Sequence, residues 1–167
     1  MNNYLKLNNL SKKYEGNKSL KVLNNINFKF ESGKVYSIVG PSGSGKSTLL
    51  NLLSLIDIPS SGFIEFNNKK IDTNSTIEND SIRSKNIGII YQDKNLLADF
   101  TALENVLLPN LLVTKDKKKS IDLAKKLIKQ FGLNLRFNHF PSELSGGENQ
   151  RIAIARAIIN EPNIILA

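Results

Sequence analysis

The chain begins with a pattern typical of strands and then changes to one typical of a helix. Apolar residues alternate with polar ones over residues 26–30, which predicts a strand, and Ser32-Gly33 supplies a turn. The mostly apolar run over residues 35–39 predicts a second strand that is buried on both faces. Leucines and an isoleucine then recur at helical spacing over residues 47–56. We therefore expect two strands followed by a helix.

The rest of the chain predicts short strands separated by helices. We expect strands over residues 63–66, 87–91 and 164–166, the last of them buried, a polar loop with a short helix over residues 69–86, and helices over residues 101–106, 120–131 and 147–159. Thr101 and Glu104 have the spacing of a capping box, and Pro109 is expected to end or kink the helix that they begin. Gly132 and Pro162 are expected to stop the two later helices.

Composition limits the classes of protein to which the chain can belong. Its 167 residues, 40% of them hydrophobic, can bury one core, so we expect a single domain. The absence of cysteine excludes disulfides, zinc–thiolate sites and thiol catalysis. The net charge of +8 permits a nucleic-acid partner, but the lysines are scattered apart from the run Lys115 to Lys119, which we interpret as a solvated helix start. No apolar run approaches the ~18 residues that cross a bilayer.

Gly40 to Ser47 fits the pattern G-x-x-x-x-G-K-S of a phosphate-binding loop. An expected strand precedes it and an expected helix follows, an order that favours this reading over an ordinary glycine-rich turn. The glycines let backbone N–H groups surround a phosphate, and the helix directs its positive end at it. Lys46 would neutralise the β- and γ-phosphates, and the Ser47 hydroxyl would contact Mg²⁺. The loop alone predicts a nucleoside triphosphate without distinguishing GTPases, kinases and motor ATPases.

A second glycine motif, Leu144-Ser145-Gly146-Gly147-Glu148, is followed by Gln150-Arg151. A hydroxyl and two glycines at the start of an expected helix can make a further anion site, from bare N–H groups and the helix dipole. A serine cap with a flexible glycine pair is the alternative, and it fits poorly beside a phosphate loop. The motif resembles the signature of the ABC ATPases, and with it the resemblance covers essentially the whole chain.

This resemblance implies an α/β fold: a P-loop NTPase with a RecA-like parallel sheet core, an N-terminal antiparallel β region and an inserted α-helical subdomain at about residues 93–145. Residues 1–167 would then be a single, incomplete ABC ATPase domain that takes ATP and Mg²⁺. The residues expected to bind ATP are Tyr14, Gly40, Pro41, Ser42, Gly43, Ser44, Gly45, Lys46, Ser47, Thr48 and Gln92. In the family the signature acts on the nucleotide of a second, head-to-tail subunit, and the corresponding residues are Ser145, Gly146, Gly147 and Glu148.

Two of these residues match the family by their positions, and for Gln92 the sequence Ile90-Tyr91-Gln92 also fits. Tyr14 resembles the family's aromatic residue that stacks on adenine, although a packing tyrosine fits its position almost as well. Gln92 follows an expected strand and resembles the glutamine that contacts Mg²⁺ and senses the transporter. The resemblance therefore implies a metal site that includes Ser47 and Gln92.

Residues 47–53, 99–106 and 141–148 resemble the group of ABC ATPases that serves lipoprotein release and the export of macrolides or antimicrobial peptides. This resemblance implies a subunit that drives a bacterial membrane permease, an exporter of lipoprotein, peptide or drug. Its partners would be a second ATPase subunit and the permease, with no nucleic acid and no direct membrane insertion. It would lie in the cytoplasm, where the permease would hold it on the inner face of the cell membrane.

The end of the chain affects the expected activity. In the family a strand like residues 163–167 runs into an aspartate that orders Mg²⁺ and a glutamate that polarises the attacking water, and neither is present before the chain stops at Ala167. We therefore assign no catalytic residue. Because positioning water and stabilising the phosphoryl group is most of what the protein does in this chemistry, we expect hydrolysis from the intact protein and weak or no hydrolysis from this polypeptide alone.

Two alternatives remain open at this point. A non-transport ABC ATPase acting on ribosomes or DNA would suit the basic charge, but such proteins usually carry tandem domains or coiled-coil insertions. A truncated module that only binds nucleotide or a partner subunit is the other alternative.

Overall fold

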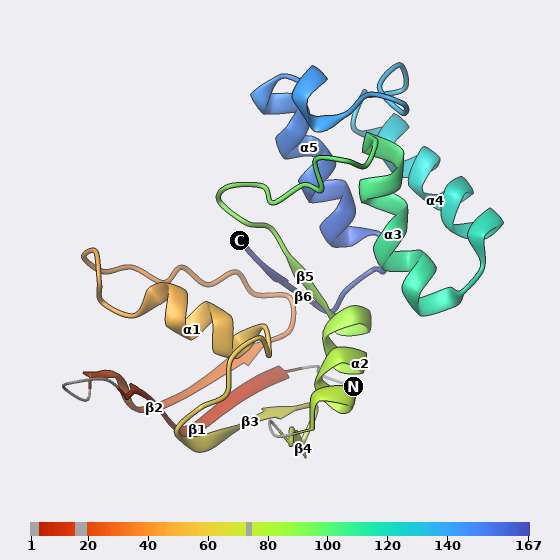
Figure 1. The fold of residues 1–167 in the computed structure, drawn as a ribbon. Helices are drawn as coiled ribbons and strands as arrows, with labels where there is room; N and C mark the ends of the chain where they lie inside the picture. Colours follow the sequence, from red (N-terminus) through yellow and green to blue (C-terminus); the bar gives the residue numbers. More distant parts are fainter. Residues whose placement is uncertain (1–3, 16–19, 73–74) are drawn as a thin grey trace. The chain divides into compact units, whose positions relative to one another are not determined.

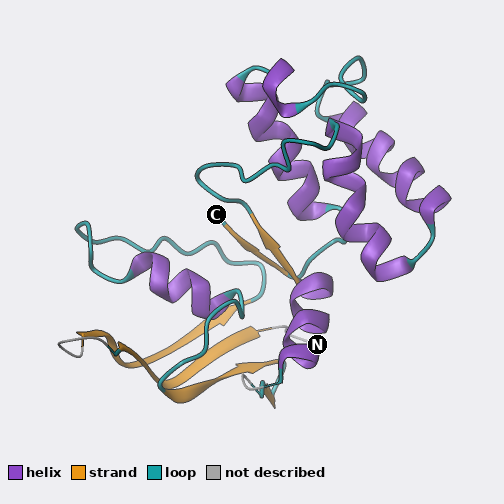
Figure 2. Ribbon diagram, in the orientation of Figure 1, coloured by secondary structure: helices purple, strands orange, loops and turns teal. Residues whose placement is uncertain are grey.

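The structure is a computed structural model that describes residues 4–15, 20–72 and 75–167 (Figure 1). Contacts between residues divide the chain into two compact units, Met1–Ser81 and Ile82–Ala167. Strands predominate in the first unit and helices in the second (Figure 2).

An antiparallel sheet forms most of the first unit. Its strands are β1 (Tyr4–Tyr14), β2 (Leu20–Glu31), β3 (Ser61–Phe66) and β4 (Lys69–Lys70), in the order β2-β1-β3-β4. Helix α1 (Lys46–Leu53) lies along one face of the sheet (Figure 1). Leu7, Leu10 and Ile64 of the sheet are fully buried, as are Leu52 and Leu53 of α1, so the alternation of the strands and the spacing of the helix supply one core.

Several expectations for this unit are confirmed. The strands expected over residues 26–30 and 63–66 lie within β2 and β3, and α1 covers most of the helix expected over residues 47–56. The short strand β4 was not expected. Asn67 and Asn68, both with positive φ (51° and 65°), make the tight turn that returns β4 onto β3.

The prediction of a strand over residues 35–39 is wrong. This segment belongs to none of the described strands, and Val35 and Val39 are 97% and 86% exposed. A strand forms only where a neighbour receives its backbone hydrogen bonds, and no strand in the described part of the chain pairs with this segment. The segment is mostly apolar, but apolar composition does not show whether a neighbouring strand is available to pair with it and bury it.

Three helices pack around one apolar core in the second unit. The unit contains β5 (Ile87–Ile89), α3 (Ala102–Thr114), α4 (Lys117–Gln130), the 3-10 turn η1 (Pro141–Glu143), α5 (Gly146–Ile158) and β6 (Ile164–Leu166), and α2 (Thr76–Asn86) leads into it. The core is made by Ala102, Val106, Leu107, Ala124, Ile128, Leu133, Leu144, Ile152, Ala155 and Ile159. The helices expected over residues 120–131 and 147–159 are confirmed as α4 and α5. Among the described residues, no helix is long and apolar enough to cross a membrane.

The parallel strands β5 and β6 form a separate two-stranded sheet. β5 ends at Ile89, earlier than the expected strand over residues 87–91, although the Ile90 N–H still donates to the Leu166 carbonyl over 2.8 Å. The expected burial of β6 is wrong, because Ile165 is 54% exposed. A two-stranded sheet covers few of its own side chains, so apolar composition overestimated the burial here.

Pro109 does not end α3, which continues to Thr114. Proline removes the N–H that would bond to the carbonyl four residues earlier, so continuation requires other contacts. Asn110, which follows it, donates to the Asn160 Oδ1 atom and accepts from the Ser120 hydroxyl, both over 2.9 Å. Just past the proline, these bonds join α3 to α4 and to Asn160, which follows α5. Tertiary contacts therefore override the expected end of the helix at Pro109.

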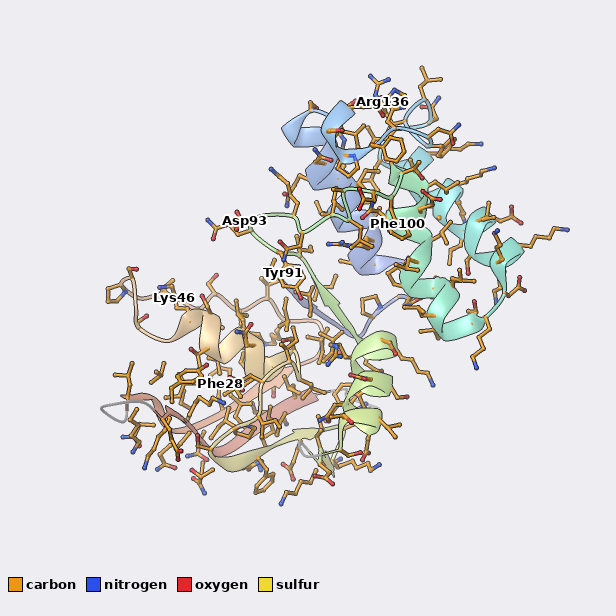
Figure 3. All side chains as sticks on the ribbon, viewed as in Figure 1. Phe28, Lys46, Tyr91, Asp93, Phe100 and Arg136 are labelled. Carbon is orange, nitrogen blue, oxygen red and sulfur yellow. The ribbon has the colours of Figure 1, made fainter. Side chains whose placement is uncertain are left out.

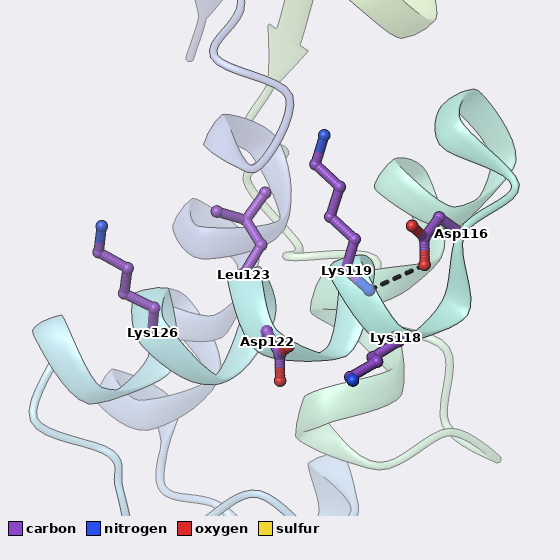
Figure 4. Close-up of a pocket in the computed structure, with 6 residues that line it drawn as sticks. All are labelled: Asp116, Lys118, Lys119, Asp122, Leu123 and Lys126. Atoms are coloured by element: carbon purple, nitrogen blue, oxygen red, sulfur yellow. Dashed lines mark hydrogen bonds between the residues drawn. The ribbon is translucent and has the colours of Figure 1, made fainter.

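The lysine run at the start of α4 is solvated, as expected. Residues 115–119 are all exposed, and Asp116 caps the helix by accepting from the Lys119 N–H over 3.0 Å. Figure 4 shows the shallow hollow along this face, lined by Asp116, Lys118, Lys119, Asp122, Leu123 and Lys126. Both signs of charge line it, which fits a solvated face better than a phosphate-tracking patch.

Asn105, only 1% exposed, fixes the chain that enters α3. Its Nδ2 donates to the carbonyls of Leu97, Phe100 and Thr101 over 3.0, 2.9 and 3.1 Å, and its Oδ1 accepts from the Leu97 N–H over 2.8 Å. The reciprocal capping box of Thr101 and Glu104 begins the helix beside it. The expected capping box is confirmed. The buried Asn105 amide supplies hydrogen-bond partners for the backbone groups of the chain that enters α3.

We predict that Asn105→Ala lowers the free energy of unfolding by about 2–3 kcal/mol, because it removes several hydrogen bonds and leaves backbone groups unpaired. Urea unfolding followed by circular dichroism measures the change. Asn134→Ala, at an exposed position of the same unit, is the matched control and should have almost no effect. Equal stability of the two variants would contradict the anchoring role of Asn105.

Candidate functional site

The phosphate loop in the first unit is shaped by glycines in conformations that other residues avoid. Gly43 and Gly45 have φ of 77° and 91°, and Gly45 is the N-cap of α1. A Cβ atom on Gly45 would lie 3.0 Å from the Leu23 Cδ2 atom and 3.2 Å from the Val22 carbonyl oxygen. Glycine is therefore required at this position both by its backbone conformation and by its close approach to β2.

Lys46 closes this loop (Figure 3). Its ammonium donates to the Gly40 and Pro41 carbonyls over 2.9 and 2.8 Å, so its charge is held against the loop. The α1 N-terminus has no side-chain cap and no acidic residue in its first turn. Uncapped N–H groups, the positive end of a helix and a lysine are together suited to the charge and shape of a phosphate chain. The residues present therefore fit a nucleoside triphosphate, with Ser47 and Thr48 in the first turn of α1.

Tyr14 lies at the same end of the sheet as this loop. The β1–β2 register pairs Tyr14 with Leu20 and Lys12 with Leu23, the residue that packs on Gly45. Tyr14 is 42% exposed, and the Lys12 ammonium lies 5.0 Å from the centroid of the Tyr14 ring. The structure thus brings the tyrosine and the phosphate loop into one region of the first unit.

Asp57 holds both of these side chains of β1. The Tyr14 hydroxyl donates to its Oδ2 over 3.0 Å, and Lys12 forms an ion pair with its Oδ1. Burial opposes ionisation of Asp57, but hydrogen bonds from Lys12, the Ile58 N–H and Tyr14 prevail and lower the pKa of this carboxyl. Tyr14 is therefore oriented by a charged neighbour, which position along the sequence did not reveal.

Gln92 lies in the second unit, in an exposed turn after β5. The Lys94 N–H donates to the Tyr91 carbonyl over 3.1 Å, which makes Gln92 the second residue of a four-residue turn. Within the described residues, no cluster of three or more His, Cys, Asp or Glu residues is suited to a metal. The oxygens of Ser47 and Gln92 are hard ligands of the kind that Mg²⁺ prefers, but these two residues lie in different units, whose relative positions are not determined.

The signature motif forms the start of α5. Ser145 is the N-cap, and its hydroxyl accepts from the Glu148 N–H over 3.2 Å, while the Glu148 Oε2 accepts from the Ser145 N–H over 2.8 Å. Apart from its chain neighbours and the backbone of its own helix, no atom lies within 4 Å of a Cβ built on Gly146, so the surface beside it is open. The structure brings Ser145, Gly146, Gly147 and Glu148 together in one exposed helical turn.

Arg136 completes this turn and was missed by sequence reasoning (Figure 3). Its Nε donates to the Glu148 Oε1 over 2.8 Å, so both carboxylate oxygens of Glu148 are occupied within its own chain. Hydrogen bonds from the Ser145 backbone, Arg136 and the Ser145 side chain lower the pKa of Glu148 to about 2. Glu148 thus stabilises the shape of the motif through its contacts with Arg136 and Ser145. No periodicity or motif links Arg136 to it in the sequence.

Asn149, which follows Glu148, holds the turn that precedes the motif. Its Nδ2 donates to the Pro141 and Leu144 carbonyls over 2.9 and 3.3 Å. These bonds join η1 to α5 and fix the direction from which the chain enters the motif. The identity of residue 149 therefore matters to the shape of the motif, even though its side chain points back into its own chain.

We predict that Arg136→Gln raises the pKa of Glu148, because the variant loses the cation and the hydrogen bond that favour the carboxylate. A carboxyl with a lowered pKa contributes stability above its ordinary value of 4.5, and loses it as the pH falls toward about 2. In the variant, the Glu148 carboxylate should therefore lose its contribution to stability over a narrower pH range, which ends at a higher pH than in the wild type. Titration of the glutamate side-chain carbons by NMR measures the shift.

Glu104 is the internal control for this titration. Hydrogen bonds from the Thr101 hydroxyl and N–H lower its pKa in a second capping box that does not involve Arg136. Its titration should be the same in the wild type and in Arg136→Gln. A Glu148 pKa that also stays unchanged would show that Arg136 does not stabilise this carboxylate.

Comparison with known proteins gives consistent matches. A family model described as ABC transporter matches residues 23–167. The lipoprotein-releasing system ATP-binding protein LolD of Wigglesworthia glossinidia brevipalpis is 49% identical, and the alignment covers 100% of this chain and 74% of the relative. The protein of the same name from Rickettsia bellii is 44% identical, with 99% and 73% covered.

Solved structures agree with these matches. A dimeric ATP-binding cassette, MJ0796, bound to ADP and Pi in a post-hydrolysis state, gives a TM-score of 0.88 at 39% identity over 96% of this chain and 72% of that chain. A second dimeric structure of MJ0796, a bacterial ABC transporter cassette, gives 0.87 at 39% identity, with the same shares covered. The expected fold class is confirmed. The chain therefore belongs to the ABC transporter family, as one of the ATP-binding subunits of this family of ATPases.

Proposed function

We propose that this chain is the ATP-binding subunit of a lipoprotein-releasing exporter and that its own ATP binds at the loop Gly40–Thr48. The observation that carries the proposal is the closed loop itself, in which the Lys46 ammonium lies against the Gly40 and Pro41 carbonyls in front of an uncapped helix. When ATP enters, its β- and γ-phosphate oxygens replace these carbonyls as the partners of Lys46. The cargo is proposed from the printed names of the two relatives.

We propose the remaining site roles on the same basis. Tyr14 stacks on the adenine ring, and Ser47 and Gln92 supply oxygens to Mg²⁺. Bound Mg²⁺ would offset phosphate charge and orient the γ-phosphate. These roles require the two units to act as parts of one ABC ATPase domain, in which the helical subdomain spans about residues 93–145.

The signature turn is proposed to act on the ATP of a second subunit in a head-to-tail dimer. Ser145 offers a hydroxyl, and Gly146 and Gly147 offer N–H groups at the positive end of α5. The open space beside Gly146 supports this role, since a phosphate chain could approach the backbone there. Closure of the dimer on ATP would move a membrane permease, to which the subunit binds on the cytoplasmic face of the membrane.

We predict that Lys46→Ala lowers Mg-ATP affinity by at least about a hundredfold, because a charge-assisted contact to the phosphates is lost within a water-exposed loop. Isothermal titration calorimetry with Mg-ATP measures the change. Lys34→Ala removes an exposed lysine from the same unit and should bind as the wild type does. Unchanged affinity in Lys46→Ala would refute the site.

The cargo has a separate readout for the same variant. Vesicles that contain the permease and the wild-type protein should release a bound lipoprotein when ATP is added, and vesicles with Lys46→Ala should retain it. Release of peptides or drugs without release of lipoprotein would contradict the proposed cargo and leave the ATP site intact.

We predict that Gly146→Val leaves ATP affinity unchanged but weakens ATP-dependent dimerisation at least about tenfold. Beyond its chain neighbours and the backbone of its own helix, the added Cβ meets no atom within 4 Å, whereas the side chain would obstruct a partner's phosphate. Sedimentation velocity with and without ATP measures the dimer. Ser142→Ala, exposed in η1, is the control, and a dimer of wild-type strength in Gly146→Val would contradict the proposed role of the signature.

A further inference from the structure

The loop that carries Gln92 is fastened to the helix that begins with the signature motif. Arg156 of α5 donates from Nη1 to the Asn95 carbonyl over 2.6 Å and from Nη2 to the Lys94 carbonyl over 2.7 Å. These two carbonyls follow Gln92 and Asp93 directly in the chain. Both ends of this contact lie in the second unit.

The backbone at this contact adopts an unfavourable conformation. Lys94 and Asn95 are consecutive non-glycine residues with φ of 61° and 44°. The Asn95 N–H also donates to the Asp93 carbonyl over 2.7 Å, which closes a tight turn. Adjacent left-handed conformations cost free energy at non-glycine residues, and contacts that hold the turn offset this cost. Arg156 supplies that restraint, since its planar guanidinium bonds to both carbonyls at once.

The Arg156 side chain is well suited to this contact. It is partly buried, and burial lowers the pKa of its guanidinium, so it is a desolvated cation bonded to backbone oxygens. Two parallel N–H donors at a fixed spacing are a property of arginine, and lysine presents its donors from a single atom. Arg156→Lys therefore keeps the charge while removing the two-point contact.

We propose that Arg156 is a positioning residue that holds the Gln92 turn on the signature helix, so that the ligand to Mg²⁺ and the motif offered to the partner's ATP move as one piece. The proposal rests on the proposed function of Gln92. Arg156 lies ten residues beyond Gly146, about 15 Å along a continuous helix. A rigid helix of this length carries a displacement at one end to the other.

A second contact of the same loop does not involve Arg156, so a local effect of Arg156 can be told apart from unfolding of the whole loop. The Leu97 N–H donates to Asn105 of α3, not to Arg156. The chain between β5 and α3 is therefore held at two independent points. Loss of the Arg156 contact should free the amides of Lys94 and Asn95 while the amide of Leu97 remains protected.

The test is hydrogen exchange on the nucleotide-free protein, followed at single amides by NMR. In Arg156→Lys we expect exchange at Lys94 and Asn95 to rise by about tenfold, and exchange at Leu97 and along α4 to stay as in the wild type. Unchanged exchange at Lys94 and Asn95 would overturn the proposal. A rise that includes α4, with a lower melting temperature, would also overturn it, because Arg156 would then serve the fold as a whole.

A second measurement tests the consequence for Gln92. The ratio of ATP dissociation constants without and with Mg²⁺ should fall at least about threefold in Arg156→Lys, while the affinity for ATP without metal is unchanged. Lys125→Ala, an exposed position on α4, is the control and should preserve both values. An unchanged ratio would overturn the positioning role. Failure of the proposed role of Gln92 would be distinguishable, because Gln92→Ala would then leave this ratio as in the wild type.

Discussion

The need to satisfy the free N–H groups at helix starts organises both glycine motifs. Helices α3 and α5 satisfy part of this need internally, through capping boxes in which Thr101 and Ser145 accept from the N–H groups of Glu104 and Glu148. Helix α1 begins at Gly45 with no side-chain cap, and its first residue is a lysine. Backbone donors that a protein leaves unpaired must be paired by water or by a ligand. The uncapped start of α1 is therefore suited to hold a phosphate chain, and glycines surround it because they have no side chain to intrude.

Helix α5 combines three tasks along its length. Its first turn presents the signature motif, its middle contributes Ile152 and Ala155 to the core, and Arg156 near its end holds the loop after Gln92. Because the middle is packed against α3 and α4, neither end can shift without disturbing buried side chains. The signature motif and a loop distant in the sequence are in this way held by a single packed helix, which is one arrangement that can carry coupling between sites.

Local patterns predicted most of this molecule, and the failures have a common cause. Alternation identified β2 and β3, helical spacing identified α4 and α5, and capping residues identified the start of α3. The strand expected over residues 35–39 and the burial expected for β6 failed because both depend on neighbours far away in the sequence. The residues that the motifs assign to a ligand stay a prediction. The motifs could not identify Arg136, Asp57 or Arg156, which act through side-chain contacts that only folding creates.

The place of Glu148 follows from these contacts. A carboxylate in the first turn of a helix is stabilised by the helix dipole, yet it would repel the phosphate that the same turn is proposed to meet. The hydrogen bonds of Glu148 to Ser145 and Arg136 resolve this conflict, since they direct its two oxygens toward its own chain and set a guanidinium beside it. Because its pKa is about 2, the carboxylate is ionised at neutral pH and the pair is fully charged. The surface left for an incoming anion is then the Ser145 hydroxyl and the glycine N–H groups, whose positive potential the paired carboxylate no longer cancels.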